Sequence, residues 1–354
     1  MNHRVQKLAS ALSYFSGAAV RRWRRQAADA GGLTAVTCYH RVLPDTGRRG
    51  AGASVAEGIP ASTFEAQMHF LLRHFEPVPA SSLSELPPDG RLRFAVTFDD
   101  GYLDNHDIAA PILQRLGVPA TFYVVSNHVG SGRRFWWDLL GEWLRSTGRQ
   151  ALDLAQVLPD HAVAGQPSRL VLEGGSSRQR AASRLENLLR PLAPLEVEQA
   201  MVRLATALGD VDAAGDGPTP LMHWDHLRSL AKSGFEIGAH SADHLNLAAV
   251  DDFELERQVA GARRSIEDNT GQAVQTFAYP YGGRAHFDAR VAASVRAAGY
   301  RAAFTALPGI VSAGQDSTAL PRVALNWPWG FACAHNLDRA LAAAAATPQD
   351  NMVS

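Results

Sequence analysis

Residues 94–101 read FAVTFDDG, and this stretch indicates both the fold class and the place of a functional site. Its first five residues form a short apolar run, which predicts a buried β-strand. The strand ends in Asp99 and Asp100, and Gly101 then permits a tight exit. In α/β folds the carboxyl ends of strands carry the chemistry, so one carboxylate can bind a metal while its neighbour acts as a base. Asp-Asp-Gly is also an ordinary turn sequence, which leaves a structural role open.

Six other β-rich runs occur along the chain, separated by segments with helical periodicity. The seven predicted strands span residues 33–39, 93–98, 120–125, 235–239, 274–279, 301–305 and 320–325. Helical patterns cover residues 62–75, 105–116, 223–233, 251–270 and 286–298. Strands that alternate with helices predict an α/β protein with a parallel sheet or barrel.

The alternation is interrupted once, between about residues 138 and 220, where amphipathic helical patterns replace strands. We interpret this stretch as a helical insertion into a single domain of residues 32–340. A basic amphipathic segment, residues 1–31, precedes that domain, and residues 341–354 are predicted to form a tail.

Composition excludes several classes of protein. The chain has 354 residues, with 34 basic against 35 acidic side chains and a net charge of -1, so it lacks the positive field that holds a nucleic acid. Its two cysteines, Cys38 and Cys333, rule out a disulfide scaffold and a zinc site built on paired cysteines. No apolar run approaches the roughly 20 residues that span a bilayer. A metal would therefore be held by histidines and carboxylates.

The amino-terminal segment carries one apolar stripe beside basic residues. Four arginines within residues 21–25 follow the stripe, where a secretory signal would need small residues and few charges, so we expect a cytoplasmic protein. The stripe can either dock on the body of the protein or lie on the inner surface of a membrane as an interfacial helix. Its apolar members are Val5, Leu8, Leu12, Phe15 and Ala19.

A second candidate motif, HSADH at residues 240–244, follows the predicted strand 235–239. Two imidazoles four residues apart fall on one side of a helical turn and can share a divalent ion. Both this pair and the carboxylate pair follow strands, so they can converge at one barrel mouth. Asp100, His240 and His244 would then supply three ligands and leave positions for water and substrate.

These motifs resemble those of the polysaccharide deacetylases, carbohydrate esterase family four, also called the NodB homology domain. TFDDG at 97–101 looks like the first motif of that family, and HSADH at 240–244 is similar to its second. LGVPATF at 116–122 also resembles the family. AYPYG at 278–282 looks like its third motif, although Ala278 stands where the family has arginine.

The resemblance implies a distorted (β/α)7 barrel with the helical insertion added to it. It also implies that Asp99 is the general base and that Asp100, His240 and His244 bind Zn²⁺, with Co²⁺, Ni²⁺ or Fe²⁺ as alternatives. The backbone N–H at Tyr281 would stabilise the oxyanion, and Tyr281 would line the substrate site.

The general acid of the family is usually a histidine after a late strand, but residues 319–326, ALPRVALN, contain none. CYHRV at 38–42 resembles a branch of the family in which the histidine motif has moved to the first strand. We therefore predict His40 as the acid, with His335 as its competitor. Arg322 and Arg41 are the two candidates to orient the base in place of the missing arginine.

Tryptophans near the predicted barrel mouth suit the apolar faces of sugar rings. Trp136 follows the third strand, next to Trp137, while Trp327 and Trp329 follow the seventh strand. We predict sugar contacts for Trp136, Trp327 and Trp329, and packing of the insertion onto the barrel is the alternative role.

Taken together, these features predict a metal-dependent hydrolase that removes N-acetyl groups from an N-acetylated sugar in a polysaccharide or glycan precursor, with a role in exopolysaccharide biosynthesis. Two other readings stay open: an O-acetyl esterase of the same family, and a barrel that binds glycan without turnover. We expect a carbohydrate substrate, no nucleic acid partner, and contact with the inner membrane surface if the basic helix binds there. The sequence does not indicate an oligomeric state.

Overall fold

The computed structural model describes residues 10, 12–45, 58–165, 167–209, 221–325 and 330–346. Seven parallel strands form the central sheet in the order β1, β5, β6, β9, β10, β11 and β13. Their bounds are β1 (Leu33–Tyr39), β5 (Leu92–Phe98), β6 (Ala120–Val124), β9 (Glu236–Ala239), β10 (Thr276–Ala278), β11 (Ala302–Pro308) and β13 (Leu320–Arg322).

The first and last strands of this order meet and nearly close the sheet into a barrel. Val323, which follows β13, donates its backbone N–H to Val36 at 2.7 Å and accepts one from Cys38 at 3.1 Å. All seven predicted strands are therefore present, and the predicted distorted (β/α)7 barrel is confirmed. Two short strands extend the sheet: β4 (Glu76–Pro77) pairs parallel with β5, and β12 (Val311–Ser312) pairs antiparallel with β1. Outside the sheet, β2 (Val42–Leu43) pairs with β3 (Ile59–Pro60).

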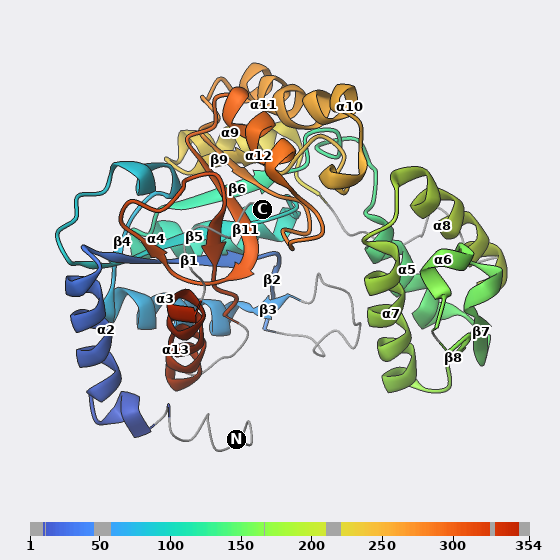
Figure 1. Cartoon of the computed structure of the whole chain (residues 1–354), viewed down its shortest axis with the longest axis horizontal. Helices are drawn as coiled ribbons and strands as arrows, with labels where there is room; N and C mark the ends of the chain where they lie inside the picture. The colour runs from blue at the N-terminus through green and yellow to red at the C-terminus, as the bar shows by residue number, and fades with distance from the viewer. Residues whose placement is uncertain are drawn as a thin grey trace.

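Helices surround the strands, with α9 to α12 on one side and α2, α3 and α13 on the other (Figure 1). Their bounds are α2 (Ala18–Asp29), α3 (Ala61–His74), α4 (Ala110–Leu116), α9 (Trp224–Lys232), α10 (Asp252–Glu256), α11 (Ala262–Thr270), α12 (Ala289–Ala297) and α13 (Gly330–Ala346). Two helices predicted as continuous contain a π-helical segment, Asn105–Ala109 before α4 and Arg257–Gly261 between α10 and α11. Between strands and helices lies an apolar core in which Phe98 stacks on Phe122 with ring centroids 5.0 Å apart.

The helical insertion forms a lobe at one side of the barrel (Figure 1). As the amphipathic patterns predict, it contains helices, of which the longest are α5 (Trp136–Ser146), α7 (Gly175–Leu189) and α8 (Pro194–Leu208). It also contains the short helix α6 (Asp160–Val163) and an antiparallel pair, β7 (Ala151–Asp153) and β8 (Arg169–Val171), which the helical periodicity did not indicate. Buried leucines of α5, α7 and α8 give the lobe an apolar core of its own.

The amino-terminal helix α2 (Ala18–Asp29) packs on the body of the protein through Ala19, Trp23 and Ala27. The indole of Trp23 donates to Asp338 at 2.8 Å, which ties α2 to α13 (Gly330–Ala346). This last helix continues five residues beyond the predicted start of the tail at 341. In the described residues, no helix combines the length and the apolar character needed to cross a bilayer.

Candidate active site

A cavity of about 190 Å³ lies where β1, β5, β9, β10 and β13 end. It brings together residues from almost the full length of the chain, as expected if the carboxyl ends of the strands converge. The lining residues are Cys38, His40, Asp99, Asp100, Trp137, Arg190, His240, His244, Tyr279, Tyr281, Ala306 and Arg322.

Asp100, His240 and His244 form a buried cluster that can hold a metal ion. Oδ1 of Asp100 lies 3.5 Å from Nε2 of both histidines and has no hydrogen-bond partner in the described structure. Nδ1 of His240 lies 2.7 Å from the carbonyl oxygen of Ala278, which can only accept. Nδ1 therefore carries the proton, and Nε2 presents its lone pair to the cluster, as a metal-binding histidine does.

Burial keeps both histidines of the cluster in the neutral form. It lowers the pKa of His240 and, more strongly, that of His244, and both imidazoles are therefore neutral at neutral pH. Burial and the nearby Asp99 carboxylate raise the pKa of Asp100 well above its usual range when no cation is present. A divalent cation would reverse that effect, because it favours the ionised carboxylate.

The two histidines lie in a loop after β9, not on the helical turn that their spacing indicated. Ser241 and His244 adopt left-handed backbone angles, with φ of 62° and 56°, and the imidazole centroids are 4.8 Å apart. The hydroxyl of Ser241 accepts the backbone N–H of His244 at 2.9 Å, which stabilises this loop. Left-handed conformations of non-glycine residues are rare and gather at functional sites.

Asp99 pairs with Arg322 through two hydrogen bonds of 2.7 Å, one to each carboxylate oxygen. Arg322 also donates to the carbonyl of Thr305 at 2.8 Å, so the guanidinium is held from two sides. Burial alone would raise the pKa of Asp99, but the charge and hydrogen bonds of Arg322 outweigh it and bring the pKa well below its usual range. Asp99 is therefore ionised at neutral pH.

Arg41, the other predicted partner of the base, lies elsewhere. Its Nε donates to Asp104 at 2.8 Å, and its guanidinium lies 4.9 Å from the centroid of the Tyr102 ring. Arg41 is not among the residues that line the cavity.

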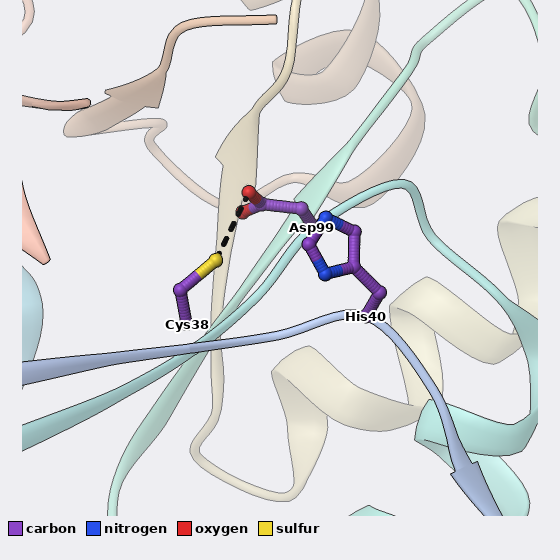
Figure 2. Close-up of side chains that lie close together, drawn as sticks. All are labelled: Cys38, His40 and Asp99. Atoms are coloured by element: carbon purple, nitrogen blue, oxygen red, sulfur yellow. Dashed lines mark hydrogen bonds between the residues drawn. The ribbon is translucent and has the colours of Figure 1, made fainter. Parts of the chain in front are cut away.

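His40 and Cys38 point from the end of β1 toward the Asp99 carboxylate (Figure 2). Burial lowers the pKa of His40 to about 4, and the imidazole is therefore neutral at rest. The Cys38 thiol donates to Asp99 at 3.5 Å, and burial raises its pKa far above the usual value. A protonated thiol and a carboxylate already paired with arginine make these three residues a poor second metal site.

His335, the competing candidate for the general acid, lies in α13 outside the cavity, and its imidazole is hydrogen-bonded to Ser10 at 3.0 Å.

Tyr281 closes another side of the cavity in a tight turn after β10. Its φ is 60°, and its ring lies at 88° to that of His244, with centroids 4.6 Å apart. Burial raises the pKa of its phenol to about 12. The backbone N–H of Tyr281 has no acceptor among the hydrogen bonds of the described residues. This N–H is therefore available to a ligand.

The insertion supplies one wall of the cavity. Trp137, at the start of α5, lines the cavity and stacks on Phe135 with centroids 4.4 Å apart. Trp136 does not line it, and its indole instead donates to the Tyr281 hydroxyl at 3.1 Å. Trp327 and Trp329 lie outside the described residues, so their predicted role stays a prediction.

Arg190, at the end of α7, also lines the cavity, and sequence reasoning missed it. No motif surrounds it, and it follows an amphipathic helix whose arginines are ordinary for a surface. The spacing of residues along α7 carries no information about which of them meets the barrel.

A model of the polysaccharide deacetylase family matches residues 88–149 and 209–303. The two segments contain Asp99, Asp100, His240, His244 and Tyr281. The interval between them covers β7, β8 and α6 to α8 of the insertion. These two segments of the chain are therefore similar to the polysaccharide deacetylase family.

The chain is also similar to individual proteins. YxkH of Bacillus subtilis, whose name assigns it provisionally to the polysaccharide deacetylases, is 32% identical over 77 residues, which are 20% of this chain and 28% of the relative. A polysaccharide deacetylase structure from Bacillus cereus has a TM-score of 0.52 at 18% identity, covering 86% of this chain and 69% of that one. For IcaB of Ammonifex degensii the TM-score is 0.51 at 20% identity, with 86% and 97% covered. At these identities the structural likeness is one of fold.

Proposed function

We propose that this protein is a metal-dependent deacetylase that removes N-acetyl groups from a sugar within a polysaccharide or glycan precursor. One observation carries the proposal: a buried Asp100, His240 and His244 cluster shares a cavity with the ionised Asp99 and with His40. The family to which the matched segments are similar supports an acetylated carbohydrate as the substrate.

The residues of the cluster fit a divalent metal ion. One carboxylate and two imidazoles suit Zn²⁺, and the partnerless Oδ1 of Asp100 is a buried acceptor that a cation would satisfy. When bound, such an ion supplies Lewis-acid polarisation of the acyl carbonyl and lowers the pKa of a water molecule. We propose Zn²⁺ as the ion, with Co²⁺, Ni²⁺ and Fe²⁺ as alternatives.

Asp99 is proposed as the general base and Arg322 as the residue that orients it. The two bonds from Arg322 hold both carboxylate oxygens and keep the group ionised, so Asp99 can accept a proton from the attacking water. Arg322 thereby does what the family arginine at position 278 would do, from a different strand. Arg41 does not take this role, because it pairs with Asp104 and does not line the cavity.

His40 is proposed as the general acid, as in the family branch with a histidine on the first strand. Its imidazole lies beside the Asp99 side chain (Figure 2). With a pKa of about 4 the neutral ring must first take up a proton, and negative charge developing on the substrate favours that uptake. In the complete reaction, the hydroxyl of water bonds to the acyl carbon and the bond from that carbon to nitrogen breaks. The remaining proton of the water ends on the leaving nitrogen.

Tyr281 is proposed to stabilise the oxyanion through its backbone N–H. A fixed backbone donor needs no reorganisation when charge develops on the carbonyl oxygen, which is the basis of such sites. Trp137 and Trp136 are proposed to contact or support the sugar, the first from the cavity wall and the second through Tyr281.

The test is acetate release from N-acetylglucosamine oligomers, before and after chelation and after return of Zn²⁺. We expect release to be lost on chelation and restored by the metal. Asp99→Asn should lower the rate by about 100-fold or more while metal binding remains, because a general base contributes at least that much. His240→Ala should lose both activity and metal.

Near-normal turnover by Asp99→Asn would contradict the assignment of the base. Hydrolysis of acetyl esters without hydrolysis of the amide would indicate an O-acetyl esterase. Glycan binding with metal present and no turnover of either bond would indicate a binding barrel.

We also propose that the amino-terminal helix contacts an anionic membrane surface from the cytoplasmic side. Leu12 and Phe15 are 63% and 74% exposed, and the arginines at 21, 22, 24 and 25 are exposed beside them. Ala19, from the same apolar stripe, packs on the body instead. Exposed apolar side chains next to exposed basic ones are typical of interfacial segments.

A further inference from the structure

The cavity contains a positive charge that the proposed hydrolysis does not use. Arg190 reaches the cavity from the end of α7, and its side chain is 25% exposed. Its Nη2 donates to Glu186 at 2.9 Å. Within the described part of the chain, Nε and Nη1 of Arg190 have no protein partner. The donors on Nε and Nη1 are therefore available to a ligand.

Glu186 fixes the arginine without blocking it. The Glu186 side chain is only 4% exposed, one turn before Arg190 on the same helix. A buried carboxylate that holds one edge of a guanidinium reduces the freedom that the arginine would lose on binding. The arrangement therefore prepares Arg190 to use its remaining donors toward the cavity.

The other charged groups of the cavity already face one another. Arg322 is bonded to Asp99, and Asp100 faces His240 and His244. A neutral N-acetylated sugar offers hydroxyl, ether and amide groups, none of which carries a charge for another arginine. A carboxylate or a phosphate carries a negative charge, and it binds a guanidinium through two parallel hydrogen bonds.

The exposed face of α7 continues this polar surface away from the cavity. Ser176, Arg180, Ser183 and Asn187 recur at intervals of three or four residues before Arg190, and all four are exposed. From Ser176 to Arg190 the row runs for about 21 Å along the helix. Glu186 is the single acidic residue within α7, and it is buried. Hydroxyl, amide and guanidinium groups in one row suit a chain of sugars that carries negative charge.

We propose that the substrate is an anionic glycan, in which a carboxylate or phosphate lies beside the N-acetylated sugar and binds Arg190. This inference rests on the proposed deacetylase function and adds the chemical class of its substrate. The exposed row on α7 holds the sugars that extend from the cavity. Specificity for the charged substrate thus comes from the insertion, and the chemistry comes from the barrel.

The test measures binding, so that it does not depend on turnover. Three matched N-acetylated oligosaccharides are titrated into the metal-loaded protein: a neutral one, one with a uronic acid carboxylate and one with a phosphate group. Arg190→Ala removes the cation, Arg190→Lys retains the charge without the planar fork, and Arg203→Ala on α8 is the matched control. If Arg190→Ala does not fold because the buried Glu186 loses its bond to Arg190, the variant with Glu186→Gln added replaces it.

We expect at least one charged oligosaccharide to bind about tenfold or more tightly than the neutral one, since a hydrogen bond to a charged group contributes enough for that. In Arg190→Ala, the affinity for this charged oligosaccharide should fall to that for the neutral one. The affinity of Arg190→Lys should be intermediate, and that of Arg203→Ala should equal the affinity of the unchanged protein. The charged oligosaccharide that binds more tightly than the neutral one, with its carboxylate or its phosphate, identifies the anionic group.

Equal affinity for all three ligands, or an equal loss for all three in Arg190→Ala, would overturn the inference. Acetate release is measured in parallel. Selective binding of a charged ligand without acetate release would contradict only the proposed deacetylase function. Equal release from neutral and charged ligands, unaffected by Arg190→Ala, would contradict the anionic substrate alone.

Discussion

Asp99 and Arg322 form an ion pair whose side chains are 4% and 2% exposed. A buried pair of this kind adds little stability over an apolar pair of the same size, but removing one partner leaves an uncompensated charge. Its value lies in geometry, because the two parallel bonds determine which way both carboxylate oxygens point.

Arg322→Met should therefore lower the free energy of unfolding by about 3–5 kcal/mol, because Asp99 is then buried alone. Arg322→Lys should cost less stability, since it keeps the charge, but should lower kcat because it cannot bond both oxygens. Urea unfolding and acetate release measure the two effects. Unchanged unfolding of Arg322→Met would show that water replaces the arginine.

Asp138 offers a pH test away from the metal cluster. Burial raises its pKa to about 6, although the Tyr102 hydroxyl donates to it at 3.1 Å and Arg41, Arg134 and Arg145 oppose the shift. A raised pKa means that the folded protein binds the proton more tightly than the unfolded chain.

The contribution of Asp138 to stability is consequently present below about pH 4 and lost as pH rises to about 6. Relative to the unchanged protein, Asp138→Asn should gain about 3 kcal/mol of unfolding free energy across that window, from 1.36 kcal/mol for each pKa unit. Chemical unfolding of both proteins at several pH values measures this difference. A difference that stays constant from pH 4 to pH 7 would show that Asp138 has an ordinary pKa.

At the level of elements, the ends of three strands turn sharply to present the site. Asp100 after β5, His244 after β9 and Tyr281 after β10 all have positive φ, at 74°, 56° and 60°. Each such residue costs about 1–3 kcal/mol, and the surrounding barrel must supply that energy. These turns aim the side chains and backbone donors inward, which regular extension of the strands would not do.

Gly282 makes the turn after β10 possible. Its φ is 60°, and a Cβ at this position would collide with the backbone nitrogen of Ala306. Gly282→Ala should therefore displace Tyr281 and lower both stability and kcat. Gly117→Ala is the control, because its φ of 65° is similar but nothing lies within 4 Å of the added Cβ.

We expect Gly117→Ala to cost about 1–2 kcal/mol with no loss of kcat, and Gly282→Ala to cost more and to lose activity. Thermal unfolding and acetate release separate the two variants. Equal costs with full activity in both would indicate that Ala306 moves aside and that the turn tolerates a side chain.

At the level of the whole molecule, the described residues form a barrel, a lateral lobe and an amino-terminal helix (Figure 1). Leu12 and Phe15, which precede α2, are exposed apolar residues. The proposed membrane contact can be tested with vesicles of anionic and of neutral lipid. The protein should sediment with the anionic vesicles, because each arginine near such a surface contributes about 1 kcal/mol.

Replacing Leu12 and Phe15 together by serine should weaken that sedimentation. Phe253→Ser is the control, because this side chain is 82% exposed on another part of the molecule. The same binding in the double variant, or no binding to any vesicle, would contradict the membrane contact.

Local patterns predicted most of the barrel. All seven strands were predictable because a buried strand requires a short apolar run, wherever it lies. Their ends were less predictable: β10 covers three of the six residues expected, since apolar character reports burial and not hydrogen bonding. The pair β7 and β8 was missed because strands of three residues are too short to show a period.

The sequence by itself determined the fold class and the cluster of Asp100, His240 and His244, because strand-end motifs follow from neighbouring residues. Only the tertiary structure decided that Arg322 and not Arg41 pairs with Asp99, since this depends on closure of the barrel between β13 and β1. It also decided that Arg190 enters the cavity, because docking of the insertion joins residues with no shared local pattern. Contacts between distant segments depend on how the elements pack, and no periodic pattern in the sequence indicates this packing.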